Sequence, residues 1–379
     1  MTGQFPTLAA AASWHAAWLE EAALPLWAVA GVDGLRGSFQ EALTPEGEPR
    51  PAPRRSRVQT RQIWVYATAA AAGLGDPGHA ALARRAYGFY GAHYRRPDGL
   101  FARLADVEGE LLDSTGALYE QAFALLAMSA LEQLEPGGFE PDALALRMAL
   151  DSMRHAAGGF REVGPQPFQA NAHMHLLEAA LAWEGAGADG GWNVLADEIA
   201  ELALARFVAP PAGVLREFFD ADWNPLEDAA GGLVEPGHQF EWAWLLHRWG
   251  RARGREDAAE AARRLYATGL TGVEASSGIV VNALWSDLTV RDAGARLWGQ
   301  TEYLKAALLF GDEPEALRAA GGLATYLQTP CRGTWRDKRT ADGGFVAEPA
   351  PATSFYHLLG AILPLSARPF AAEVDAGSA

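Results

Sequence analysis

The 379-residue sequence has little cysteine and comparatively few basic residues. Cys331 is the only cysteine, which excludes an internal disulfide and a zinc site built from several thiolates, and favours a reducing compartment. The 31 Lys and Arg residues are outnumbered by 47 Asp and Glu residues, so the net charge is −16. Such a charge repels a phosphate backbone, and no nucleic-acid partner is expected.

The sequence also lacks a segment typical of a signal peptide or a membrane span. The N-terminal stretch MTGQFPTLAAAASWHAAWLEEAA has no basic start and carries His15, Glu20 and Glu21 within its apolar part. We therefore expect a cytoplasmic protein without a membrane partner. The 49% apolar residues suffice for a large core, and we expect one domain over residues 1–379 with a short flexible tail from about residue 368.

What the chain does contain is a series of Ala-rich segments with Leu, Trp and Phe at three- and four-residue spacing. This period is typical of helices, and few strands are expected. The Gly- and Pro-rich loops between the segments are long for a simple bundle, which indicates a function for them. The predicted helices cover residues 8–28, 59–74, 78–94, 115–133, 141–155, 171–184, 191–207, 237–250, 257–269, 299–310, 313–328 and 353–365.

The predicted helices alternate between two kinds. Some, such as 78–94 and 257–269, are amphipathic and fit an outer layer, whereas the others begin with polar or aromatic residues and then become almost wholly apolar. One distinctive polar residue recurs near the start of each inner helix, at intervals of 58, 56, 63, 64 and 55 residues. This repeat predicts an all-α (α/α)6 barrel, a toroid of six helical hairpins in which these residues share one end. The residues are Arg61, Tyr119, His175, His238, Glu302 and His357.

The stretch VEPGHQFEWAWLL, residues 234–246, carries the first candidate for catalysis. Pro236 and Gly237 predict a switch from loop to helix, which places His238 in the first turn and Glu241 on the same face. A carboxylate can orient an imidazole, and a helix N-terminus disfavours the imidazolium form. His238 is therefore either a base supported by Glu241 or a structural histidine at a helix end.

The stretch FQANAHMHLLEAALAWE places Asn171, His175 and Glu178 on one helical face. His173 points elsewhere, so a metal pair of His173 and His175 is disfavoured. Asn171 and His175 are candidate substrate contacts, although capping and core packing would also account for them.

The stretch PATSFYHLLGAILPL repeats this arrangement. Thr353 or Ser354 can cap the helix, and His357 follows one turn later. A lone histidine on an apolar helix is often a core residue, so His357 gains a catalytic role only if it faces His238.

Arg61 enters a helix with almost no other charge. Its guanidinium can hold a developing oxyanion or sugar hydroxyls, or form a salt bridge with a loop carboxylate. Aromatic rings stack on the C–H faces of sugars, and a possible wall for a polar ligand follows from several further residues. These are Tyr119, Phe123, Trp298, Tyr303 and the pair Glu302 and Lys305.

Five motifs together resemble the N-acylglucosamine 2-epimerase superfamily, which includes mannose isomerases and cellobiose 2-epimerases. They are TRQIWVYA, NAHMHLLEA, EPGHQFEWAWLL, QTEYLKAAL and SFYHLLGAI, in the family's order. The resemblance implies an (α/α)6 barrel and sugar isomerisation or epimerisation without a metal or other cofactor. It implies His238 and His357 as acid and base, Arg61 at the reacting oxygen, His175 at the sugar, and Glu241 in support of His238. It also implies substrate-binding roles for Asn171, Tyr119, Trp298 and Glu302.

Proton abstraction beside a carbonyl needs a base with a pKa near the working pH and a cation at the oxygen. We expect an isomerase of the mannose/fructose type acting on an unphosphorylated sugar, because no Gly-rich phosphate loop is present. The basic stretch CRGTWRDKR leaves a sugar phosphate open. The protein is expected to be a monomer or a homodimer.

Three alternatives remain open from the sequence. The first is a 2-epimerase acting on mannose/glucose, cellobiose or an N-acylhexosamine. The second is a sugar-binding protein without turnover. The third is a glycoside hydrolase that would use paired carboxylates, for which the candidates are Asp220, Asp222, Glu217 and Glu241.

Overall fold

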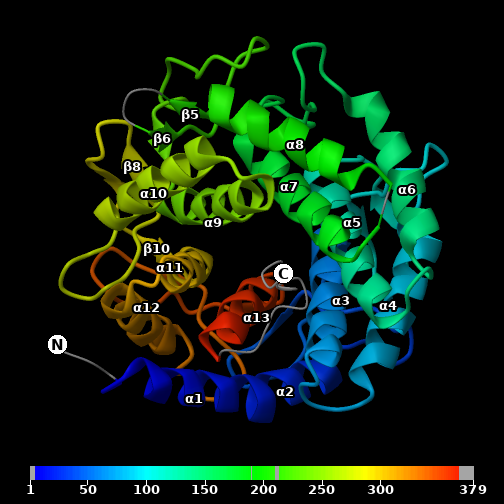
Figure 1. Cartoon of the computed structure of the whole chain (residues 1–379). Coiled ribbons are helices and arrows are strands. Elements are labelled where there is room, and N and C mark those ends of the chain that lie inside the picture. Colours follow the sequence, from blue (N-terminus) through cyan, green and yellow to red (C-terminus); the bar gives the residue numbers. More distant parts are fainter. Residues whose placement is uncertain (1–4, 189, 210–212, 367–379) are drawn as a thin grey trace, which may run out of the picture.

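A computed structural model, which describes residues 5–188, 190–209 and 213–366, confirms the predicted all-α barrel (Figure 1). Six inner helices form a closed ring in which each contacts the next and the last contacts the first. The inner helices are α3 (Ser56–Ala71), α5 (Leu118–Leu134), α7 (Ala170–Gly185), α9 (Pro236–Arg253), α11 (Leu297–Leu309) and α13 (Ser354–Leu365).

The outer layer surrounds this ring (Figure 1). It consists of α1 (Leu8–Trp18) with α2 (Leu24–Val29), α4 (His79–Tyr94), α6 (Glu140–Ala149), α8 (Trp192–Leu202), α10 (Glu256–Thr271) and α12 (Glu313–Tyr326). The predicted helix 8–28 contains a π-helical segment, Leu19–Ala23, between α1 and α2. The predicted helix 141–155 is α-helical only as far as Ala149, the last residue of α6, and continues as a 3-10 segment, Leu150–Met153.

The difference between the two layers follows from their contacts. An inner helix such as α5 touches both neighbours in the ring and an outer helix behind it, so nearly every residue from Leu118 to Glu132 is buried. An outer helix such as α10 buries one face only, which explains its amphipathic sequence.

The loops contain short antiparallel strands that the helical spacing of the sequence did not reveal. They pair as β1 (Ala42–Leu43) with β12 (Ala350–Pro351), β5 (Val208–Ala209) with β6 (Val214–Leu215), and β10 (Ala295–Arg296) with β11 (Lys338–Arg339). Two sheets have three strands, namely β2 (Arg54–Arg55), β3 (Leu104–Ala105) and β4 (Leu111–Asp113), and β7 (Leu233–Val234), β8 (Ala283–Trp285) and β9 (Val290–Asp292). Strands β2, β7, β10 and β12 directly precede inner helices, so the sheets lie at the end of the barrel where those helices begin.

A repeated turn follows the outer helices. In all six repeats a glycine with positive φ is followed two positions later by a buried apolar residue. Glycine suits this position because a side chain would be strained there. The pairs are Gly37 and Phe39, Gly99 and Phe101, Gly158 and Phe160, Gly213 and Leu215, Gly278 and Val280, and Gly333 and Trp335.

A polar side chain in the first turn of an inner helix binds this repeated turn in five of the repeats. At the first one, the Phe39 amide donates to Gln59 Oε1 at 2.7 Å, and Gln59 Nε2 donates to the Phe39 carbonyl at 2.9 Å. Gln121, His173, Gln239 and Gln300 accept from the amides of Phe101, Phe160, Leu215 and Val280. These bonds fix the loops over the end of the barrel from which the predicted site residues project.

None of the described helices is long and apolar enough to cross a membrane. The predicted tail from about residue 368 lies outside the described residues.

Candidate active site

The two predicted acid–base histidines gather around one indole ring. His238 lies in the first turn of α9 and His357 in the first turn of α13. The ring of Trp298, on α11, lies 5.0 Å from the His238 ring and 6.1 Å from the His357 ring between centroids. Both histidines therefore lie beside one ring, and the catalytic role of His357 stays a prediction.

His357 has the environment of a neutral base. Its Nδ1 lies 2.8 Å from Glu302 Oε1 and donates the hydrogen bond, so Nε2 carries the lone pair. Burial lowers the pKa of His357 well below 6.5, and the cations Arg61 and Lys305 lower it further. The ring is therefore unprotonated at neutral pH and free to accept a proton.

His238 has the opposite environment. Its Nδ1 lies 3.0 Å from Glu217 Oε2 and 2.8 Å from Glu235 Oε2. Burial alone would lower the pKa of His238, but the charges of these two carboxylates outweigh it and raise the pKa well above 6.5. The expectation that the helix N-terminus keeps this imidazole unprotonated is wrong, because the charges of two adjacent carboxylates outweigh the effect of the helix dipole.

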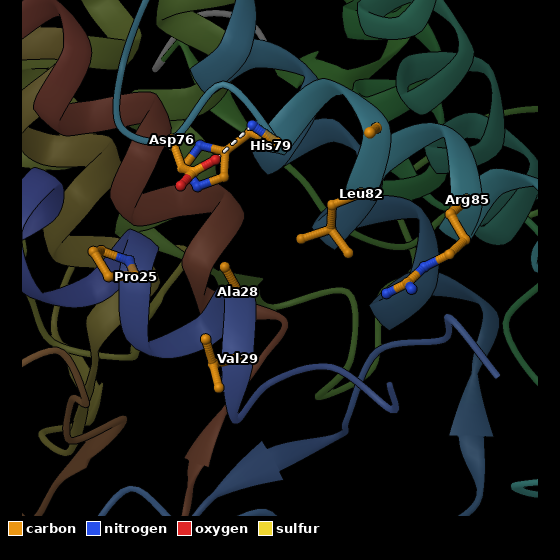
Figure 2. Close-up of a pocket in the computed structure, with 9 residues that line it drawn as sticks. Pro25, Ala28, Val29, Asp76, His79, Leu82 and Arg85 are labelled. Carbon is orange, nitrogen blue, oxygen red and sulfur yellow. Dashed lines mark hydrogen bonds between the residues drawn. The ribbon is translucent and has the colours of Figure 1, made fainter. Parts of the chain in front are cut away.

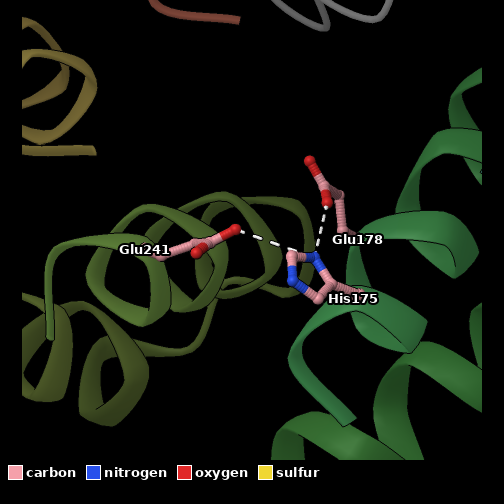
Figure 3. Close-up of side chains that lie close together, drawn as sticks. All are labelled: His175, Glu178 and Glu241. Carbon is pink, nitrogen blue, oxygen red and sulfur yellow. Dashed lines mark hydrogen bonds and ion pairs between the residues drawn. The ribbon is translucent and has the colours of Figure 1, made fainter. Parts of the chain in front are cut away.

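The predicted support of His238 by Glu241 is also corrected. The carboxylate of Glu241 is directed to the neighbouring inner helix α7, where its Oε1 lies 3.7 Å from Nδ1 of His175 (Figure 3). Glu178 lies 3.3 Å from the same nitrogen. Although Glu241 and His238 share a helical face, the carboxylates that lie beside Nδ1 of His238 are those of Glu217 and Glu235.

Burial favours the neutral forms of both His175 and Glu241. Burial lowers the pKa of His175 to about 4, despite the hydrogen bond to Glu178. Burial and then the charge of Glu302 raise the pKa of Glu241 well above 4.5. Glu178 differs because it accepts from both His175 and the hydroxyl of Tyr356 and lies near Lys305, which lowers its pKa against the cost of burial.

Arg61 provides a cation beside this network. Its Nη1 donates to the Thr353 carbonyl at 3.1 Å and its Nη2 to the Tyr119 hydroxyl at 2.6 Å, and the guanidinium lies 4.1 Å from the centre of the Phe123 ring. These partners carry no charge, and no carboxylate within the described part of the chain forms an ion pair with Arg61. Its Nε is buried and has no hydrogen-bond partner there. Neutral contacts rather than the alternative salt bridge thus hold the guanidinium, and they leave its Nε–H unused.

Buried oxygens of three other predicted candidates lack a hydrogen-bond partner among the described residues. They are Asn171 Oδ1, Glu217 Oε1 and Glu241 Oε1. Buried polar atoms are nearly always hydrogen-bonded, so a cluster of unsatisfied atoms indicates a place where a polar ligand or water binds. The predicted substrate contact Asn171 carries one of these atoms, and no side-chain capping bond forms at the start of α7.

Three residues of the sequence prediction have other roles in the structure. Thr353 precedes α13 without a side-chain capping bond, and Ser354 donates to Asp337. Tyr303 packs against Phe240 and binds Glu315 of the outer helix α12, so it does not belong to the predicted ligand wall. Its side chain therefore lies against α9 and the outer helix α12.

Two groups of side chains are close enough to hold a cation: His175, Glu178 and Glu241, and Glu217, Glu235 and His238. In both groups the histidine Nδ1 already lies within hydrogen-bond distance of a carboxylate. The metal-free site therefore stays a prediction that a chelator can test.

The sequence analysis did not identify Glu235 and Tyr356 as site residues. Glu235 lies three residues before His238, at the boundary of α9, and Tyr356 is adjacent to His357. Glu235 belongs to the EPGH motif. It lies just before α9 rather than within it, and from there its carboxylate reaches the imidazole of His238.

A cavity of about 520 Å³ lies away from this site, between α2 and α4 (Figure 2). Its walls include Pro25, Val29, Leu82 and Arg85, with His79 at one end. The His79 ring binds the Leu74 carbonyl through Nδ1 and is part of the packing. None of the predicted site residues lines this cavity.

A sequence model of the N-acylglucosamine 2-epimerase family matches residues 37–361. The chain belongs to this family. A mannose-6-phosphate isomerase from Rhizobium meliloti (strain 1021) is 46% identical over 369 residues, which cover 92% of this chain and 95% of the relative. A D-mannose isomerase from Thermobifida fusca is 33% identical over 262 residues, 63% of each chain.

The solved structure of a cellobiose 2-epimerase from Bacillus thermoamylovorans B4167 superposes with a TM-score of 0.84, at 17% identity, over 94% of this chain and 99% of that one. It shows the same toroid. The family and its relatives confirm the prediction that the protein is an isomerase.

Proposed function

We propose that the protein interconverts a mannose-type aldose and the corresponding ketose. The observation that carries the proposal is the contrast between the two histidines, one held neutral and the other protonated, at a single indole ring. Two groups whose environments separate their pKa values are the usual basis for assigning an acid and a base. The names of the two sequence relatives support mannose as the parent sugar.

In the proposed reaction, Nε2 of His357 removes the proton from C2 of the open-chain aldose. The electron pair moves into the C1–C2 bond, and the C1 oxygen gains charge that the unused Nε–H of Arg61 stabilises. The His238 imidazolium protonates this oxygen. His357 then returns its proton to C1 while His238 takes the proton from the C2 hydroxyl, which leaves a ketone at C2 and both histidines as they began.

The phosphorylation state of the sugar has two candidates. Three basic residues of the stretch that left a phosphate open pair with carboxylates: Arg332 with Glu21 at 3.2 Å, Lys338 with Glu348 at 2.8 Å, and Arg339 with Glu274 at 3.5 Å. This supports the free hexose expected from the sequence. The relative at 46% identity is named for mannose 6-phosphate, which supports the phosphorylated sugar as the second candidate.

Two other reactions are less well supported. A 2-epimerase would return the proton to the opposite face of C2, and two imidazoles at one site allow that as well. A hydrolase would need paired carboxyl groups beside a glycosidic bond. Of the four candidates, Asp220 and Asp222 are exposed, Glu217 is bound to His238, and Glu241 lies beside His175.

The test is incubation of the protein in heavy water with mannose, mannose 6-phosphate and glucose, with and without EDTA, followed by NMR. Isomerisation gives the ketose with deuterium at C1, whereas epimerisation gives the C2 epimer with deuterium at C2. Absence of turnover on every hexose would overturn the proposal. Loss of turnover with EDTA alone would overturn the metal-free mechanism.

A further inference from the structure

We propose that Lys305 is a positioning residue that holds His357 as the base, acting through Glu302. This inference rests on the proposed function for the role of His357, and it adds a residue that the reaction scheme does not use. It starts from a buried lysine, which is uncommon in a protein core unless the ammonium group is paired.

The geometry places one carboxylate between an ammonium and an imidazole. Lys305 Nζ donates to Glu302 Oε2 at 2.7 Å, while Glu302 Oε1 accepts from Nδ1 of His357 at 2.8 Å. Glu302 is fully buried and Lys305 is 5% exposed. Each oxygen of the carboxylate thus has one partner, so Lys305 fixes the orientation in which Glu302 meets His357.

Lys305 itself is held in place from two further sides. Its ammonium lies 4.4 Å from the centre of the Trp244 ring, on α9. The carboxyl groups of Glu241 and Glu178 act on it together with Glu302, and these charges raise its pKa although burial opposes them. The lysine is therefore a fixed cation at the meeting point of α7, α9 and α11.

The loss of this cation would change the imidazole. Lys305 is one of the groups that lower the pKa of His357, so its removal raises that pKa and leaves Glu302 without a compensating charge. A larger fraction of His357 would then be protonated and unable to accept the C2 proton. The groups that act on His357 are Arg61 from α3, His175 and Glu178 from α7, and Glu302 and Lys305 from α11; the titratable groups of α1, which also contacts α13, are not among them.

The first measurement compares kcat/KM against pH for Lys305→Met, Lys305→Arg and the unchanged protein. Lys338→Met is the matched control, because Lys338 is half-exposed on β11 and pairs with Glu348. We expect the acidic limb of Lys305→Met to move up by about one pH unit or more, which is a loss of about tenfold at a pH below that limb. Lys305→Arg keeps the charge and should restore the limb, and KM should change little.

A second measurement separates this inference from the reaction. Histidine ring signals are followed by NMR against pH without substrate, and His357→Gln identifies the signal of His357. An upward shift of the His357 pKa in Lys305→Met supports the inference even if no hexose is turned over. An unshifted His357 pKa in a folded Lys305→Met protein overturns it, as does a uniform loss of activity with an unchanged pH profile.

Discussion

His238 and His357 contact the same indole, that of Trp298, although 119 positions separate them in the chain. Three different inner helices supply the three rings. Closure of the toroid brings the starts of these helices to one end of the barrel, and the proposed two-histidine reaction depends on this common end. The opposite charge states of the rings follow from which carboxylates each helix start meets.

Replacement of either histidine by glutamine should abolish turnover. Glutamine keeps much of the size of the side chain and can still bind a carboxylate, but it cannot transfer a proton. We expect kcat to fall by about 10²–10⁴-fold in His238→Gln and in His357→Gln, measured by ketose formation. His247→Gln on the same helix as His238 is the control, since that half-buried residue packs on Phe310. Activity within a few-fold of the original in either variant would remove that histidine from the mechanism.

The pH dependence of kcat/KM should show a broad plateau around neutrality. His357 must be neutral, and its pKa lies well below 6.5, so activity persists as the pH falls below 6.5. His238 must be protonated, and its pKa lies well above 6.5, so activity also persists as the pH rises. Glu235→Gln removes one charge from His238 and should move the basic limb to lower pH. A narrow bell with both limbs near 6.5 would contradict the assigned charge states.

Arg61→Lys should reduce activity more than the conserved charge suggests. A lysine cannot bind the Thr353 carbonyl and the Tyr119 hydroxyl while presenting a further donor to the substrate. We expect a loss of about 10²–10³-fold in kcat, the size found when one oxyanion donor is removed. Steady-state kinetics with unchanged circular dichroism is the measurement, and a variant with normal kcat would place Arg61 outside the reaction.

His173→Gln should make the protein less sensitive to acid. His173 is buried and its pKa is lowered to about 4, mainly by burial, from 6.5 in the unfolded chain. Between these values only the unfolded chain binds the proton, so the free energy of unfolding falls as the pH falls, by up to about 1.4 kcal/mol per pH unit.

Gln59, Gln121, Gln239 and Gln300 make the equivalent contact elsewhere in the ring, so glutamine fits this position. Urea unfolding at pH 7 and pH 5 gives the difference in slope between the two proteins. Because His15 and His175 also have a pKa of about 4 and remain in the variant, only part of the acid sensitivity should disappear. An identical loss of stability in both proteins would show that His173 does not titrate on unfolding.

The helical period and the sixty-residue recurrence were enough to predict the toroid. Helix spacing is a local property, and the recurring polar residue marks the start of each inner helix, so the shared end of the barrel followed from the sequence. The contact of His238 and His357 with one ring required only that the six hairpins close.

The carboxylate partners could not be predicted in the same way. Glu217 lies 21 positions before His238, on the loop between β6 and β7, so its place beside the imidazole depends on the tertiary structure. Glu241 faces His175 on α7, and this contact depends on how α7 and α9 pack in the ring. One missed pattern was present in the sequence: a glycine, an apolar residue two positions later and, in three of the repeats, a glutamine another 20 positions on. This pattern marks the turns that follow the outer helices, which the three- and four-residue spacing of apolar residues does not reveal.

Strand β1 pairs with β12, and α13 seats against α3, so the ring is sealed between its first and last repeats. The proposed base is carried by the final helix. A chain that lacked α13 would therefore lack the proposed base, even with the other inner helices in place.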